Sequence, residues 1–250
     1  FEYTAHNKTL FTGSDSVRGG RFSITMPVPM DISYADAEGL LNFYAADSAA
    51  VRMAHGHFNN LIVGGTAVSG DNDGVGPEIK LYLNTPSFMN GGKVNSTPCL
   101  CAELYDENGI NTVGSGIGHD ILAIVDNDPA HTYNLNSVYV PVAGDYKRGT
   151  IMLPLNTLEP GEHTLMLRAW DLYNNSSVAR ISFVVEPGLL PEILDFSITA
   201  SPVVNGMPAS FVVSHNRPQS GVDITLEIFS TQGQLLWRNV DSVVCDGLYY

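Results

Sequence analysis

Charged residues are scarce in this sequence, and positive ones are the scarcest. Only 15% of the 250 residues are Asp, Glu, Lys or Arg, and 26 acidic residues outnumber 12 basic ones, which gives a formal net charge of −14. A nucleic-acid partner requires a basic surface that neutralises phosphates, so this composition argues against one. It argues equally against an anionic membrane surface and fits an extracellular or periplasmic surface protein.

Cysteine is also rare, with three residues at Cys99, Cys101 and Cys245. An odd number cannot pair completely within the chain, and a bridge between Cys99 and Cys101 would close a very tight ring. No Cys-x-x-Cys pair or Cys/His set has the spacing of a structural zinc site. We therefore expect all three to be buried as small apolar side chains, and we expect no cofactor.

Long hydrophobic runs are missing too, since none reaches the ~18 residues of a membrane-spanning helix. The chain is instead divided by 24 Gly and 14 Pro into short stretches in which apolar and polar residues alternate. This period of two is typical of half-buried β-strands. The sequence predicts an all-β fold of tandem immunoglobulin-like β-sandwich domains.

The clearest alternation runs from Leu158 to Val185. Pro160 and Gly161 form a turn signal. Beyond it, alternate residues fall on one side of an extended chain: His163, Leu165, Leu167 and Ala169. Alternation resumes after a polar segment, so we expect two sandwich strands joined at one end.

His163 follows Gly161 by two residues, where immunoglobulin-like sandwiches place a corner Tyr that bonds back to the turn. We expect His163 to donate this bond. A general-base role is the alternative, because His is the commonest base, although no nucleophile lies nearby in the sequence. Gly247 and Tyr249 repeat the spacing, and a strand should follow them. We therefore interpret the chain as part of a longer, secreted protein.

Two linkers divide the chain into three units. Ser69–Pro77 and Glu186–Pro191 are both rich in turn formers. The resulting prediction is a β-rich domain at 1–70, an immunoglobulin-like sandwich of about seven strands at 75–187, and a partial sandwich at 191–250. A partial sandwich has an open core and a free edge, so we expect the third unit to be marginally stable or to pair with another chain.

The strands expected from alternation and turn signals cover the whole chain. They lie at 21–29, 39–45, 61–65, 79–83, 99–104, 121–126, 134–142, 149–153, 163–170, 178–185, 193–198, 211–213, 222–229 and 234–237. A short helical turn is expected at 48–53.

Two acidic turns suggest calcium, because carboxylates spaced two residues apart suit hard cations. Asp71 and Asp73 lack the remaining ligands of an EF-hand loop. Asp126 and Asp128 belong to a turn whose carboxylates water alone can solvate, and this interpretation is the favoured one. We expect a linker and a solvated turn, although a cation at either remains an alternative.

The run Gly114–Asp120 lacks the spacing of a dinucleotide fingerprint, and no helix follows it. We expect a tight loop in which His119 and Asp120 bond backbone amides. His55 and His57 would share one side of a strand, but no third metal ligand is apparent. The sequence thus predicts no catalytic, cofactor-binding or metal-binding residue.

Several runs together resemble one family, the PorU-like sortases of the Bacteroidetes type IX secretion system, which are gingipain-like cysteine peptidases. These runs are Asp15–Val17, Val28–Ile32, Gly74–Ile79, Asp106–Asn111, Gly116–Ile121, Tyr133–Asn136, Gly161–Leu165, Ala169–Asp171, Asn174–Ser176 and His215–Asn216. The resemblance spans nearly the whole chain, and 106–177 is its most specific part. It matches the region that follows the catalytic domain.

The resemblance implies an outer-membrane protein exposed at the cell surface. Its peptidase domain removes the C-terminal signal of secreted cargo and transfers the cargo to a lipopolysaccharide anchor. The catalytic His and Cys of the family lie in an α/β domain that no stretch here matches, so no catalytic residue carries over. The expected partners are the chain's own peptidase domain, secretion-system components and cargo, without membrane insertion.

Two other hypotheses compete with the one that the resemblance implies. A glycan- or protein-binding adhesion module would gather aromatic rings on one solvent-facing surface. The candidate rings are Tyr82, Tyr105, Tyr139, Tyr146 and Trp170. An independent hydrolase would need His119 or His163 within hydrogen-bond reach of a nucleophile.

Overall fold

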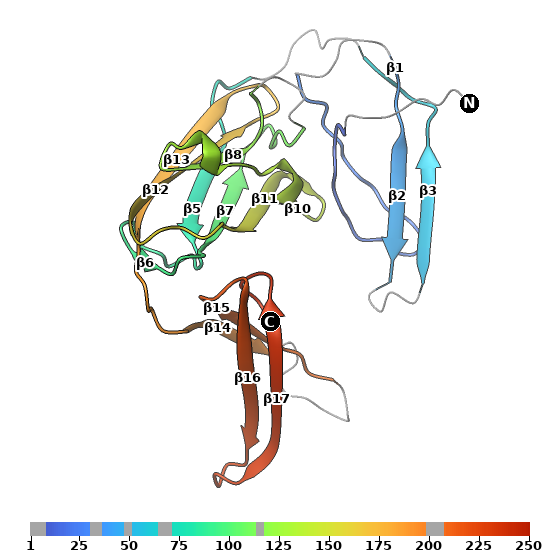
Figure 1. Ribbon diagram of the computed structural model, residues 1–250. Helices are drawn as coiled ribbons and strands as arrows, with labels where there is room; N and C mark the ends of the chain where they lie inside the picture. Colours follow the sequence, from blue (N-terminus) through green and yellow to red (C-terminus); the bar gives the residue numbers. More distant parts are fainter. Residues whose placement is uncertain (1–8, 31–36, 48–51, 65–71, 114–117, 199–207) are drawn as a thin grey trace, which may run out of the picture.

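The computed structural model describes residues 9–30, 37–47, 52–64, 72–113, 118–198 and 208–250, and nearly all of its regular structure is β-strand. Figure 1 shows a ribbon near the N-terminus, a central sandwich, and a third unit that holds the C-terminus. The helical elements described are two 3-10 turns, Pro129–His131 and Asn136–Val138. No described helix is long and apolar enough to cross a membrane. The predicted all-β sandwich fold is confirmed.

Two sheets form the central sandwich (Figure 1). The first has the order β10 (Tyr139–Val142), β11 (Asp145–Pro154), β7 (Cys99–Tyr105), β5 (Glu78–Leu83). The second has the order β6 (Lys93–Val94), β13 (Ser176–Val185), β12 (Gly161–Trp170), β8 (Leu122–Val125), β9 (Thr132–Asn134). Neighbouring strands are antiparallel, except that β6 runs parallel to β13.

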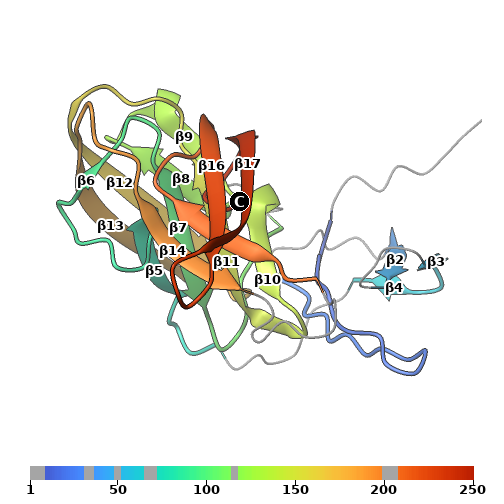
Figure 2. The same cartoon turned by 90° about the horizontal axis from the view of Figure 1, so that it is seen from below.

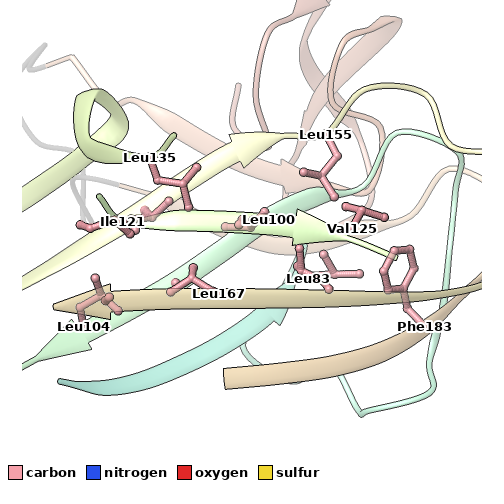
Figure 3. Packing of buried hydrophobic residues seen from close by; sticks show 14 of the residues in the cluster. Leu83, Leu100, Leu104, Ile121, Val125, Leu135, Leu155, Leu167 and Phe183 are labelled. Carbon is pink, nitrogen blue, oxygen red and sulfur yellow. The ribbon is translucent and has the colours of Figure 1, made fainter. Parts of the chain in front are cut away.

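One continuous apolar layer lies between the two sheets (Figure 3). On β12 the predicted inward side is confirmed, because Leu165, Leu167 and Ala169 are fully buried and pair with β8 or β13. Leu100 and Leu104 of β7 belong to the same core cluster. Each fully buried Leu side chain contributes about 1.5–3 kcal/mol relative to an exposed one, so this layer dominates the stability of the sandwich.

The first unit is a ribbon made of two antiparallel strand pairs. β1 (Ala37–Glu38) pairs with β4 (Ile62–Val63), and β2 (Leu41–Ala46) pairs with β3 (Met53–Phe58). Residues 48–51 of the predicted helical turn lie outside the described residues, and Met53 begins a strand. β3 is fully exposed along its length, and none of the described residues from Glu38 to Gly64 is buried.

The prediction of a strand at 21–29 is wrong. Residues 22–29 form no strand, and the only pairing here is a bridge between Arg18 and Arg21. Pro27 and Pro29 lack backbone N–H donors, so they cannot complete a ladder. The segment instead lies against the sandwich: Pro29 is buried, and Met30 N donates to the Leu172 carbonyl at 3.0 Å.

The third unit contains two separate antiparallel pairs. β14 (Ile193–Ile198) pairs with β15 (Phe211–His215), and β16 (Ser220–Phe229) pairs with β17 (Leu235–Cys245). The last residues extend the first pair, because Val213 and Tyr250 exchange two backbone hydrogen bonds of 2.9 Å. Trp237 and Tyr249 remain 47% and 55% exposed, so the core of this unit is open.

Candidate functional site

His163 forms the sandwich corner that its spacing from Gly161 predicts. Its Nε2 lies 2.7 Å from the Glu159 carbonyl and its Nδ1 lies 2.6 Å from Asp126 Oδ2. Both partners accept hydrogen bonds, so both ring nitrogens can donate when the ring is protonated, and this geometry favours the imidazolium. With neither nitrogen free, His163 lacks the lone pair that a general base needs.

The charged forms of both His163 and Asp126 are stabilised by their hydrogen bonds. Burial lowers the pKa of His163, but the bonds to Glu159 and Asp126 outweigh burial, and the net shift is upward. Burial raises the pKa of Asp126, but the Thr164 N–H and His163 reverse the shift, and the net change is downward. Asp126 lies directly after β8 and has a positive φ. This backbone conformation directs its carboxylate toward the start of β12. The pair is a structural clamp between two strands.

The acidic turns are occupied by protein groups. Asp128 Oδ1 accepts from Ala130 N at 2.9 Å, and its Oδ2 pairs with His131 at 2.8 Å. Asp73 Oδ1 accepts from Val75 N at 2.9 Å, while Asp71 lies outside the described residues. Across the described ranges, no group of three His, Cys, Asp or Glu side chains is arranged to hold a metal ion.

The His119–Asp120 segment forms part of a loop, and residues 114–117 lie outside the described ranges. The His119 ring lies 4.4 Å from the Trp170 ring. Asp120 Oδ1 accepts from the side-chain amide of Asn136 at 2.6 Å. Asn136 Oδ1 in turn accepts from Ile121 N, so the carboxylate fixes the entry into β8.

Sequence inspection missed a buried acidic pair at one end of the sandwich. Asp106 and Asp171 are 5% and 0% exposed. Burial raises the pKa of Asp106 to about 6; the Asn108 N–H opposes the rise, and the nearby Asp171 and Asp73 carboxylates add to it. Asp171 accepts three hydrogen bonds from Tyr173 and Asn175. Both residues follow a strand and cap the turn after it, which is an Asx-turn signal that the sequence does contain.

The three cysteines are buried free thiols, as predicted. Cys99 and Cys101 point from β7 to the outer face of its sheet, where they cluster with Leu248 of the third unit and with Tyr82. The side-chain hydrogen bond with Cys101 and burial raise the pKa of Cys99. Cys99 lacks the lowered pKa that a nucleophile needs, and both thiols lack the exposure.

The third unit also contacts the sandwich through polar groups. Asn95 Nδ2 donates to the Asn216 carbonyl at 2.5 Å, and Thr97 donates to the Pro218 carbonyl at 3.4 Å. The Asn216 side chain binds the linker, with its amide 3.1 Å from the Leu190 carbonyl and its oxygen 3.0 Å from Glu192 N. We call this set of contacts, together with Leu248 on the thiols, the inter-unit joint.

The aromatic residues considered for a sugar-binding face belong to separate surroundings. All five are half-buried: Tyr82, Tyr105, Tyr139, Tyr146 and Trp170. Tyr139 packs against the core and Tyr82 against the thiols, whereas Trp170 lies on the other sheet. Tyr82, Tyr139 and Trp170 therefore do not share one stacking face of the kind that carbohydrate recognition by aromatic rings requires.

Comparison with known proteins gives one informative similarity. The crystal structure of dimeric latent PorU from Porphyromonas gingivalis matches 89% of this chain with a TM-score of 0.53 and 34% sequence identity. The chain spans only 21% of that PorU chain. No family model and no curated protein matches the sequence.

Proposed function

From the similarity of this PorU-like β-sandwich region to PorU, we propose that it is the non-catalytic C-terminal part of a cell-surface sortase. The parent enzyme is a cysteine peptidase that processes the C-terminal signals of type IX secreted cargo at the extracellular side of the outer membrane. The region serves that enzyme as a scaffold and protein-docking module. The match over 89% of the chain at 34% identity is the observation that carries this proposal.

The chemistry of the described residues supports a non-catalytic role. His163 donates from both ring nitrogens, and the Cys99 and Cys101 thiols are buried. The two thiols pack with Leu248 and Tyr82, whereas a cysteine peptidase needs an accessible thiol next to a His. These observations support the assignment of the peptidase chemistry to another part of the parent chain.

An exposed apolar surface supports docking over a simple spacer. The end of the β16–β17 hairpin points away from the sandwich (Figure 1) and carries five large apolar side chains that are 40–62% exposed. They are Ile228, Phe229, Leu235, Leu236 and Trp237, and we call them the apolar tip. No charged residue lies between Glu227 and Arg238, which pair at 3.5 Å. Exposed apolar groups of this kind mark protein interaction sites.

The candidate partners are the parent's own peptidase domain, secretion-system components and cargo. Among the described strands, β17 pairs with β16 alone, so its other edge is available for pairing with a further strand. A second copy is a further candidate, since the PorU crystal structure is of a dimeric latent form.

A pull-down from outer-membrane extract tests the proposal, with residues 1–250 as bait and retained proteins identified by mass spectrometry. We expect a secretion-system component, cargo or the peptidase domain to be retained. The double variant L236D/W237A should reduce retention about tenfold or more, because it removes the centre of a desolvated contact. Met89→Asp is the matched control, since Met89 is 78% exposed on the central unit. Equal retention by all three baits would refute docking through the apolar tip.

A further inference from the structure

The two thiols on the outer face of β7 are covered by another part of the chain. Cys99 is 0% and Cys101 3% exposed, although they lie on the side of the sheet that faces away from the sandwich core. The residue that packs on both is Leu248, which is itself 1% exposed and belongs to the third unit. Figure 2, seen from below, shows the strands of the third unit crossing this sheet.

A backbone hydrogen bond ties Leu248 to the third unit. Its carbonyl accepts a 2.9 Å hydrogen bond from His215 N, so the segment 248–250 moves with β15. The third unit in turn meets the sandwich at Asn95 and Thr97. Removing the third unit from the sheet therefore removes the cover from Cys99 and Cys101.

The inter-unit joint contains buried polar atoms that lack hydrogen-bond partners, which is unusual for a permanent interface. Asn95 Oδ1 and His215 Nε2 are both buried and have no hydrogen-bond partner among the described residues. Buried polar atoms are normally paired, and each exception disfavours the buried state. The apolar part of the joint rests mainly on Leu248 with Tyr82 beside it, which is small compared with a stable interface.

We propose that Leu248 is the centre of a reversible latch, which holds the third unit on the central sandwich and on release exposes Cys99 and Cys101. The latch makes the position of the third unit, and with it the apolar tip, adjustable relative to the rest of the protein. In the closed state burial keeps the pKa of Cys99 raised and the thiol inert; release removes that burial.

Alkylation of the native full chain by a maleimide, followed by peptide mapping, measures latch opening at each thiol. We expect Leu248→Ala to raise the modification rate of Cys99 and Cys101 about 10- to 100-fold, because the side chain supplies most of the apolar contact. Leu248→Asp should raise it at least as much. Val244→Asp is the control: it places the same charge on the third unit at a residue that is 66% exposed.

A fold check separates latch opening from unfolding of the sandwich. The chain has two tryptophans, Trp170 in β12 and Trp237 in the third unit. In a Trp237→Phe background, Trp170 fluorescence reports urea unfolding of the central sandwich alone. The latch predicts faster alkylation with an unchanged Trp170 midpoint. Unchanged alkylation in the Leu248 variants would overturn it, as would wild-type alkylation that occurs only at the rate of Trp170 unfolding.

Discussion

His163 shows how one residue can look catalytic in the sequence and be structural in the fold. A His paired with an Asp suggests a base and its orienting carboxylate. Here the second ring nitrogen donates to Glu159, so the pair ties the turn before β12 to the end of β8. The spacing from Gly161 predicted the corner bond, but Asp126 lies 37 residues away and only the fold brings it near.

The His163 clamp predicts a pH-dependent stability. The pKa of His163 is raised in the folded state, so its contribution is complete below the pKa of about 6.5 in the unfolded chain and is lost as pH rises through the folded value. His163→Ala should therefore lower the free energy of unfolding by on the order of 1–3 kcal/mol at pH 6 and by less at pH 9. Urea unfolding at both pH values measures this.

His57→Ala is the control for that experiment, because His57 is exposed on β3. It should change stability by less than about 0.5 kcal/mol at either pH. An equal loss from His163→Ala at pH 6 and pH 9 would mean that the imidazolium charge is not what stabilises the corner.

Asp106 predicts a fall in stability over a lower pH range than His163 does. Its folded pKa of about 6 lies above the ordinary value of 3.8, so the folded state binds the proton more tightly and stability falls as pH rises from about 4 to 6. Asp106→Asn keeps an acceptor for Asn108 N and removes the charge. We expect it to stabilise the protein by on the order of 1–2 kcal/mol at pH 8 and by little at pH 4.5, in thermal unfolding. Destabilisation at pH 8 would contradict this account.

At the scale of elements, strands with regular alternation were predictable from the sequence. The stretches predicted at 163–170, 178–185 and 193–198 correspond to β12, β13 and β14. Each has alternating apolar and polar residues between turn formers. In β12 and β13 the apolar side is also the more buried side, so local pattern and tertiary burial agree there, whereas β14 is largely exposed.

Elements without such a pattern were missed. β3 has the sequence Met-Ala-His-Gly-His-Phe, is exposed throughout, and is a strand because β2 pairs with it. β17 extends to Cys245 through Arg238, Asn239 and Asp241, because β16 supplies a partner along its whole length. Pairing between distant segments decides these strands, and local sequence does not encode it.

The inward side of β12 gives a direct test of the core assignment. Leu167→Ala should lower the free energy of unfolding by about 2–5 kcal/mol, because it leaves a cavity between the two sheets. Glu162→Ala, at the exposed start of the same strand, should change it by less than about 0.5 kcal/mol. Chemical denaturation followed by Trp170 fluorescence distinguishes them; similar effects of both changes would refute this orientation of β12.

At the scale of the whole molecule, the three units differ in how completely they bury their apolar residues. The central sandwich has a continuous core, whereas the ribbon and the third unit leave large apolar side chains exposed. Phe22 and Phe43 are in ring contact at 5.3 Å beside the ribbon, yet Phe22 is 50% exposed. A stable centre with two incompletely buried flanks suits a module that joins other protein parts.

The most direct test of the proposed role places apolar-tip changes in the full-length parent that we propose to be a sortase. Peptidase activity on a soluble signal peptide and processing of cargo at the cell surface are measured for L236D/W237A and for Met89→Asp. The account predicts that soluble-peptide cleavage is unchanged in both, and that surface processing falls severalfold in the tip variant alone. Normal surface processing, or an equal loss of cleavage in solution, would contradict a non-catalytic docking role.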